Sequence, residues 1–304
     1  MKKIEIPEKY KKVYVWRWIS SCLFDYICIF GSMILAQQLD HPIAYIAAVL
    51  IIGARQHALG VLAHDGAHGL ISRNRVLNEI LWRPLCFFPF FVAPQAYRDF
   101  HFNHHRFSTT DKDPEVQSKY VGGDAWRLPV TQRDIVLGIL RDFFVLHFFR
   151  KRRKKIPEGI APRNLGETMP IILFWVLAMV LVYLTEGWYF LAMWLVSIPT
   201  TLVAFSRLRV WSEHTGINGT HRFGTSWWER FFIFPHNTWC HWEHHKYSYV
   251  PFYYLTKVRK LDDDQPILSS FWELVDIFSQ SSSIASGHAG LSLPSVSREP
   301  INTI

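Results

Sequence analysis

The sequence predicts an all-α integral membrane protein: four transmembrane helices in two hairpins, with a cytoplasmic helical cap that carries three histidine-rich stretches. Hydrophobic residues make up 49% of the 304 residues and aromatic residues 16%, which is rich for a soluble domain. Four apolar segments have about the length that a bilayer-spanning helix needs, roughly 20 residues. The mean hydropathy is only +0.05, so a sizeable polar part of the chain is expected outside the bilayer.

The first hairpin is predicted at 16–38 and 43–63, with a tight turn at 39–42. Asp25 lies within the first span, so its carboxylate must face the protein interior or a wet cavity. We interpret Asp25 as a helix-packing residue, with a functional role as the alternative. At 1.5 Å per residue, the second helix has crossed about one membrane thickness when it reaches His64. It therefore returns the chain to the side on which it began.

The long segment between the hairpins carries two further features. The apolar run 81–93 contains two prolines, is followed directly by Pro94 and is too short to span a bilayer, so we expect a re-entrant or interface-lying piece. The amphipathic segment 133–149 ends in the basic run 150–155, which predicts a helix lying in the headgroup region with its basic end toward anionic lipid. A nucleic-acid patch is the weaker alternative, because no nucleic-acid-binding module accompanies the net charge of +8.

The second hairpin is predicted at 169–184 and 188–206, turned by 185–187. Neither short turn contains a lysine or arginine, whereas the N-terminus, the long loop and the C-terminal part contain nearly all of them. The positive-inside rule then places both termini and every histidine stretch on the cytoplasmic side. We expect residues 1–278 to form the membrane domain and the Ser-, Gly- and Pro-rich tail 279–304 to be disordered.

Eight of the fifteen histidines lie in three short stretches with the spacings HxxxH, HxxHH and HxxHH. The stretches are His64-Asp-Gly-Ala-His68, His101-Phe-Asn-His104-His105 and His241-Trp-Glu-His244-His245. Residues three and four apart share one face of a helix, so each stretch can aim two or three imidazoles at one point. Three such stretches are difficult to explain by packing or solvation, and they predict a metal site.

The number and type of these ligands restrict the metal chemistry. Imidazoles suit zinc, copper, iron or nickel. A zinc ion takes about four ligands, so eight imidazoles imply two ions. No paired Glu-x-x-His helices occur, which excludes the soluble carboxylate-bridged di-iron bundle. The four cysteines are scattered without CxxC spacing, which argues against a zinc ribbon, an iron–sulfur site or a disulfide framework.

The order and spacing of these stretches resemble the membrane fatty acid desaturase superfamily, over roughly residues 40–260. The segment Phe100-His-Phe-Asn-His-His-Arg-Phe-Ser-Thr-Thr-Asp-Lys-Asp-Pro-Glu115 is similar to the family's second histidine box and the acidic-Pro segment that follows it. His236-Asn-Thr-Trp-Cys-His-Trp-Glu-His-His245, with Val-Pro-Phe-Tyr at 250–253, is similar to the third box and its exit.

The resemblance implies a di-iron centre that activates O2 as co-substrate and removes hydrogen from an unactivated C–H bond. It also implies a ninth histidine ligand after the fourth span, where His214 stands. His236 and Asn237 are further candidates, as outer ligands through a water or as supporting residues. The implied ligands are His64, His68, His101, His104, His105, His214, His241, His244 and His245.

A ligating histidine needs an acceptor on its other ring nitrogen, which fixes the tautomer. Six acids lie close to the stretches and are candidates, although spacing alone does not choose among them. They are Asp65, Asp99, Asp111, Asp113, Glu213 and Glu243. His57 shares a helix face with His64 and is either an outer partner or a buried, hydrogen-bonded histidine.

The leading functional hypothesis is a desaturase acting on an acyl lipid or acyl thioester. A hydroxylase or ketolase acting on a carotenoid or another hydrophobic substrate is the first alternative, and a non-catalytic metal-binding membrane protein is the second. The resemblance implies that electrons come from a separate carrier, a ferredoxin or a cytochrome b5-like protein. A basic surface that includes Arg152 and Lys154 would suit docking of an acidic carrier.

Overall fold

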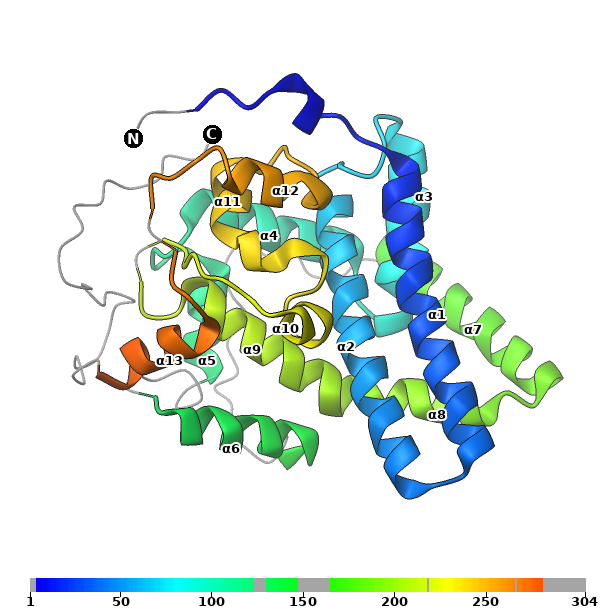
Figure 1. Ribbon diagram of the computed structural model, residues 1–304. Coiled ribbons are helices and arrows are strands. Elements are labelled where there is room, and N and C mark those ends of the chain that lie inside the picture. Colours follow the sequence, from blue (N-terminus) through cyan, green and yellow to red (C-terminus); the bar gives the residue numbers. More distant parts are fainter. Residues whose placement is uncertain (1–3, 123–129, 147–164, 218, 266, 281–304) are drawn as a thin grey trace.

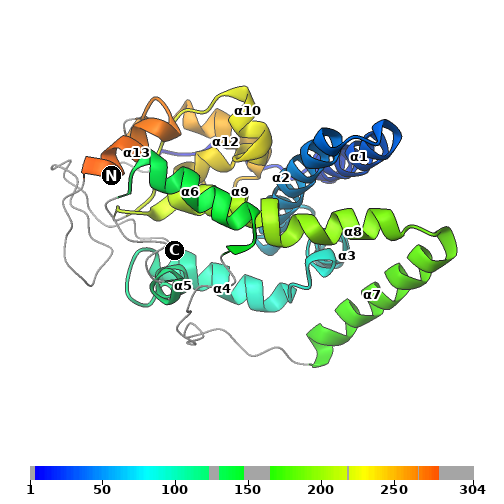
Figure 2. The same ribbon diagram turned by 90° about the horizontal axis from the view of Figure 1, so that it is seen from below.

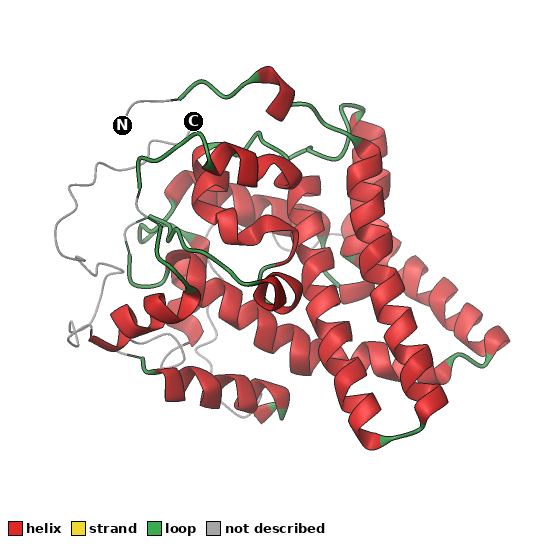
Figure 3. Ribbon diagram, viewed as in Figure 1, coloured by secondary structure: helices red, strands yellow, loops and turns green. Residues whose placement is uncertain are grey.

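The computed structural model describes residues 4–122, 130–146, 165–217, 219–265 and 267–280. Within these ranges, every secondary-structure element of three or more residues is a helix (Figure 3), which confirms the predicted fold class. Four helices are long and apolar enough to cross a membrane. They project from one side of a cap of shorter helices (Figure 1).

The first hairpin consists of α1 (Val15–Leu39) and α2 (Pro42–Ala67), close to the predicted spans. Asp40 takes the left-handed conformation (φ 42°) in the turn, and Pro42 begins α2 where a missing N–H costs nothing. The buried residues of α1 recur three or four positions apart and form one stripe. They are Trp18, Cys22, Asp25, Ile29, Met33 and Ala36. Asp25 accepts a hydrogen bond from Arg55 of α2 (3.1 Å) inside this interface.

The second hairpin consists of α7 (Leu165–Thr185) and α8 (Trp188–Ser197). A π-helical turn, η5 (Ile198–Leu202), joins α8 to α9 (Val203–His214) without a break, so the fourth span continues well beyond the predicted end at 206. Polar residues end the apolar run near 206, while the backbone stays helical to His214, so the helix is longer than its apolar part. η5 packs closely against α2 at Gly53, where the Cβ of any larger residue would lie only 1.9 Å from Thr201 Oγ1.

The segment between the hairpins forms α3 (Arg75–Cys86), η2 (Phe88–Phe90), α4 (Pro94–Phe107), α5 (Pro114–Gly122) and α6 (Gln132–Phe143). The helices before and after 91–93 meet at 98°, a bend that fits the expected re-entrant or interfacial piece. The amphipathic helix is shorter than predicted: α6 ends at Phe143, and Val145 then takes a positive φ of 61°. The basic run 150–155 lies outside the described residues.

η1 (Glu8–Tyr10) precedes α1, and the C-terminal part of the chain completes the cap with short helices. They are α10 (Trp227–Phe232), η6 (Pro235–Cys240), α11 (His241–Lys246), α12 (Phe252–Arg259) and α13 (Phe271–Gln280). One buried apolar cluster lies within this cap and a second lies among α1, α2, α3 and α8. Figure 2 shows the cap at one end of the molecule and α7 at the other. Helix α13 includes residues 279 and 280, and the rest of the predicted tail lies outside the described residues.

Candidate metal centre

Four helices bring all nine predicted histidines together within the cap. Helix α2 carries His64 and ends with His68 as its C-cap, and α9 ends with His214. The second stretch lies on α4 and the third on α11. These helices are remote in sequence, but they gather around one region in Figure 1.

The nine histidines form two groups in which the ligand nitrogens lie within 4.8 Å of one another. The first group contains five histidines: His64, His68, His101, His105 and His244. The second group contains four: His104, His214, His241 and His245. Each group has the composition of a metal site, and among the described residues no carboxylate or thiol belongs to either.

Each HxxHH stretch divides its imidazoles between the two groups. In α4, His101 and His105 face the first group while His104 faces the second. In α11 the division is reversed, because only His244 joins the first group. Adjacent residues point about 100° apart around a helix, so neighbouring histidines cannot converge on one ion. Each of these two stretches therefore aims two imidazoles at one point, as expected, and the third imidazole at the other group.

The spacing of the Nε2 atoms fits metal ligation. In each group three successive pairs of Nε2 atoms are 2.7 to 3.0 Å apart. Two imidazole nitrogens that each lie about 2.1 Å from one ion, at right angles, are about 3.0 Å apart. The Nε2 atom of His64 is buried and has no hydrogen-bond partner among the described residues.

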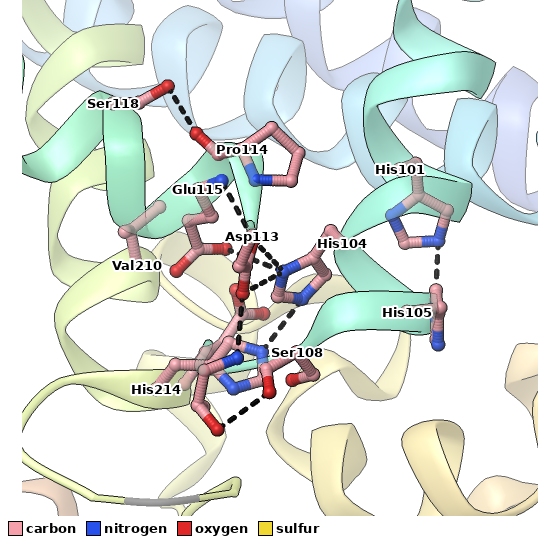
Figure 4. A network of polar contacts seen from close by, with 12 residues as sticks. His101, His104, His105, Ser108, Asp113, Pro114, Glu115, Ser118, Val210 and His214 are labelled. Carbon is pink, nitrogen blue, oxygen red and sulfur yellow. Dashed lines mark hydrogen bonds and ion pairs between the residues drawn. The ribbon is translucent and has the colours of Figure 1, made fainter. Parts of the chain in front are cut away.

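Hydrogen bonds on the opposite ring nitrogens fix the tautomers in the second group. The Nδ1 of His104 lies 3.0 Å from both carboxylate oxygens of Asp113 (Figure 4), and the Nδ1 of His214 lies 2.8 Å from the carbonyl oxygen of Gly219. These oxygens only accept, so in a neutral ring Nδ1 carries the proton and Nε2 has a lone pair. The Nε2 atoms of His104 and His214 are nevertheless 3.0 Å apart. Two facing lone pairs repel, and a cation between them removes the repulsion.

Burial keeps two imidazoles of the third stretch in the form that binds a metal. Burial lowers the pKa of His244 and of His245 well below the usual value, and neighbouring histidines lower it further. Both rings are therefore neutral at pH 7 and retain a lone pair for a ligand bond.

Two of the six candidate acids hold ligand histidines. Asp113 is fully buried, and its carboxylate also accepts backbone N–H groups of Thr109 and Glu115, both at 2.8 Å. Glu213 lies 3.3 Å from the Nδ1 of His241 and accepts a hydrogen bond from Arg209 at 2.6 Å.

The other candidate acids have different contacts. Asp65 is 3.9 Å from the Nδ1 of His64, too far for a hydrogen bond, and accepts the backbone N–H of Phe252 at 3.0 Å. Asp99 accepts a hydrogen bond from Gln95. Asp111 is exposed.

Glu243 pairs with two arginines instead of a histidine, Arg222 at 2.7 Å and Arg259 at 3.5 Å. This buried network fixes α11 against the loop before α10. Arg222 and the Gly219 carbonyl could not be predicted from the sequence, because a loop residue has no regular spacing relative to the helix that it contacts.

His236, Asn237 and His57 lie outside both groups. The Nε2 of His236 is 2.7 Å from Asp25, and Asn237 donates to the carbonyl oxygen of Phe252 at 3.1 Å. His57 is buried with its Nδ1 3.2 Å from Ser206 Oγ, as expected for a buried, hydrogen-bonded histidine.

Comparison with known proteins relates these features to one family. The sequence model described as Fatty acid desaturase matches residues 40–268, a range that contains all nine histidines. The chain is also similar to the dihydrorhizobitoxine desaturase of Bradyrhizobium elkanii, with 37% identity over 75 residues. That alignment covers 24% of this chain and 21% of the relative, so the chain matches only about a fifth of the relative's length. No solved structure matches the chain significantly.

Proposed function

The chain belongs to the fatty acid desaturase family, and from this premise we propose that it is an O2-dependent di-iron desaturase of fatty acyl chains. Family membership and the four candidate spans make it a membrane oxidoreductase of the desaturase or hydroxylase type. The proposal adds the two irons, the acyl lipid or acyl thioester substrate, and the removal of two hydrogens. The relative in Bradyrhizobium elkanii is a desaturase by name, which supports desaturation as the reaction.

The division of nine buried imidazoles into a group of five and a group of four carries this proposal. Two groups suit two ions better than one. Zinc has no redox chemistry, whereas an oxidoreductase that uses O2 needs a redox-active metal, and imidazole suits iron. Two bound irons would supply the reduction of O2 that drives hydrogen abstraction from an unactivated C–H bond.

The protein's own residues hold and orient these ligands. Asp113, Glu213 and the Gly219 carbonyl each fix one ring of the second group with Nε2 facing the centre. Such outer contacts set the ring orientation and increase ligand basicity. The histidines of both groups are buried, except for a half-buried His68, so the site limits access of water. A dry site protects a reactive oxidant from side reactions.

We further propose that the site lies on the cytoplasmic side and takes electrons from a ferredoxin or a cytochrome b5-like protein. The support is the charge pattern: the turns 39–42 and 185–187 contain no lysine or arginine. Arg152 and Lys154, the proposed docking residues, lie outside the described part of the chain. Replacing both with glutamate is expected to slow reduction by the carrier without removing the metal.

The test is a lipid and pigment mass profile from a host that supplies ferredoxin and its reductase. Wild type is compared with His104→Ala and with a matched control, His41→Ala, in the exposed turn at the far end of α2. A product lighter by two hydrogens in wild type and in the control, but not in His104→Ala, supports the proposal and reveals the substrate. A product heavier by one oxygen makes the protein a hydroxylase and contradicts desaturation. Purified wild type without bound iron would contradict the metal assignment.

A further inference from the structure

A second site lies on the opposite side of α2 from the metal centre. A cavity of about 410 Å³ opens between α1, α2, α10 and η6, and Figures 1 and 2 show α10 beside α2. Arg55, one of the residues that line this cavity, precedes His64 by nine residues on one helix. Nine residues correspond to about 14 Å of rise and half a turn of rotation, so the two side chains point in opposite directions. The residues that line the cavity are Ser20, Ser21, Phe24, Arg55, Trp227, Arg230, Phe231 and His236.

Two hydrogen-bond donors of Arg55 have no partner in the part of the chain that the structure describes. Its side chain is buried, with 2% of the residue exposed. One terminal nitrogen, Nη1, donates to Asp25 at 3.1 Å. The Nε and Nη2 atoms are buried and have no hydrogen-bond partner among the described residues. The guanidinium also lies over the ring of Phe231, 4.1 Å from its centroid, which holds the plane in place.

The Nε and Nη2 donors of Arg55 indicate which ligand chemistry the cavity suits. The N–H groups of Nε and Nη2 lie on one edge of the guanidinium and point in parallel, as a fork that matches two oxygens of a carboxylate or a phosphate. Buried donors without partners are costly, so a site of this kind favours a ligand that satisfies them. Asp25 does not fill this role, because its oxygens already contact Arg55 Nη1 and His236 Nε2 (2.7 Å).

The charges around the cavity favour a single negative charge. Arg55 and Asp25 neutralise each other as an ion pair. Arg230 also lines the cavity, is exposed, and leaves one positive charge in excess.

The remaining lining is apolar and suits an attached hydrocarbon chain. Phe24 and Phe231 line the cavity beside Trp227, of which 81% is exposed. An exposed tryptophan on a membrane protein is typical of the interface between lipid headgroups and acyl chains.

We propose that this cavity binds the oxyanion of a lipid, held by the Nε–Nη2 fork of Arg55 with its chain against the aromatic residues. The chemistry is that of a fatty acid carboxylate or a phospholipid phosphodiester. The site is separate from the metal centre and does not depend on the proposed reaction.

The experiment measures lipid binding to the delipidated, purified full-length protein by native mass spectrometry. The probes are dioleoylphosphatidylglycerol, oleate, uncharged dioleoylglycerol and inorganic phosphate. A double variant, Asp25→Asn with Arg55→Gln, removes the fork without leaving a buried charge unpaired. Ser21→Leu fills the cavity and leaves the ion pair intact, so it tests the site even if the double variant does not fold. Arg133→Gln, on the exposed surface of α6, is the matched control for charge.

Wild type and Arg133→Gln are expected to bind phosphatidylglycerol or oleate at least about tenfold more tightly than dioleoylglycerol, as two charge-assisted hydrogen bonds would provide. Both cavity variants are expected to lose this preference while retaining their metal content, which reports on the other site. Preference for phosphatidylglycerol identifies a phospholipid, and preference for oleate identifies a fatty acid. The proposal is overturned if the preference survives in both cavity variants, or if inorganic phosphate binds as tightly as the lipids.

Discussion

Asp113→Asn tests whether the carboxylate of Asp113 holds the second metal group. Both carboxylate oxygens lie 3.0 Å from the Nδ1 of His104, and each also accepts one backbone N–H, from Thr109 or from Glu115, at 2.8 Å. Asparagine would place an NH2 group opposite one of these N–H donors, whichever way its amide turns. The variant therefore loses at least one hydrogen bond in a buried site, at a cost of about 1–3 kcal/mol.

The effect on the metal is expected to be large. Loss of an outer contact to a ligating histidine costs about 10- to 100-fold in metal affinity, or roughly 1.4–2.7 kcal/mol. Iron per chain is measured by elemental analysis during titration with a chelator. Asp113→Asn is expected to release iron from one of its two sites at a chelator concentration lower by this factor, with the other site little affected.

The matched control is Asp99→Asn, the same substitution at a carboxylate on α4. This carboxylate accepts a hydrogen bond from the side chain of Gln95 and contacts no ligand histidine. The control is expected to retain iron as wild type does. Equal release from wild type and Asp113→Asn, or equal loss from Asp99→Asn and Asp113→Asn, would refute the assignment of Asp113.

Three further predictions concern other residues. His244→Ala is expected to abolish turnover while membrane insertion is retained, measured by product formation and membrane fractionation; normal turnover would exclude His244 as a ligand. Gly66→Ala is expected to lower stability by about 1–3 kcal/mol through overpacking, because a Cβ there would lie 2.4 Å from Trp82 Cγ. Gly60→Ala, on the same helix with nothing within 4 Å of its Cβ, is expected to leave the melting temperature unchanged or raise it, and equal melting of the two variants would contradict the packing argument. Because burial lowers the pKa of His244 and His245 in the folded protein, the stability they contribute is present above their unfolded pKa of about 6.5 and is lost as pH falls below it. Bound iron is expected to decrease in parallel between about pH 7 and pH 4, and constant iron over this range would show that protons do not compete at these nitrogens.

Local signals predicted the long apolar helices and the amphipathic helix. Apolar length and turn residues predicted both hairpins, because a bilayer-spanning helix satisfies its own backbone hydrogen bonds. The helix that carries the fourth predicted span continues through polar residues to His214, which the length of its apolar run does not indicate. The end of α6 was missed, because the amphipathic pattern continues beyond Phe143 while the backbone turns at Val145.

The candidate ligand histidines could be identified from the sequence, because helical spacing and the resemblance depend on residue identity along the chain. Their division into two groups could not, since it depends on how α2, α4, α9 and α11 are oriented toward one another in the folded protein. The tertiary structure also selected Asp113 and Glu213 from six candidate acids. The unpartnered fork of Arg55 arises in the same way, because Asp25, Phe231 and the cavity lining come from separate helices. Hydrogen bonds and cavities of this kind depend on distances between remote segments, which one-dimensional spacing does not encode.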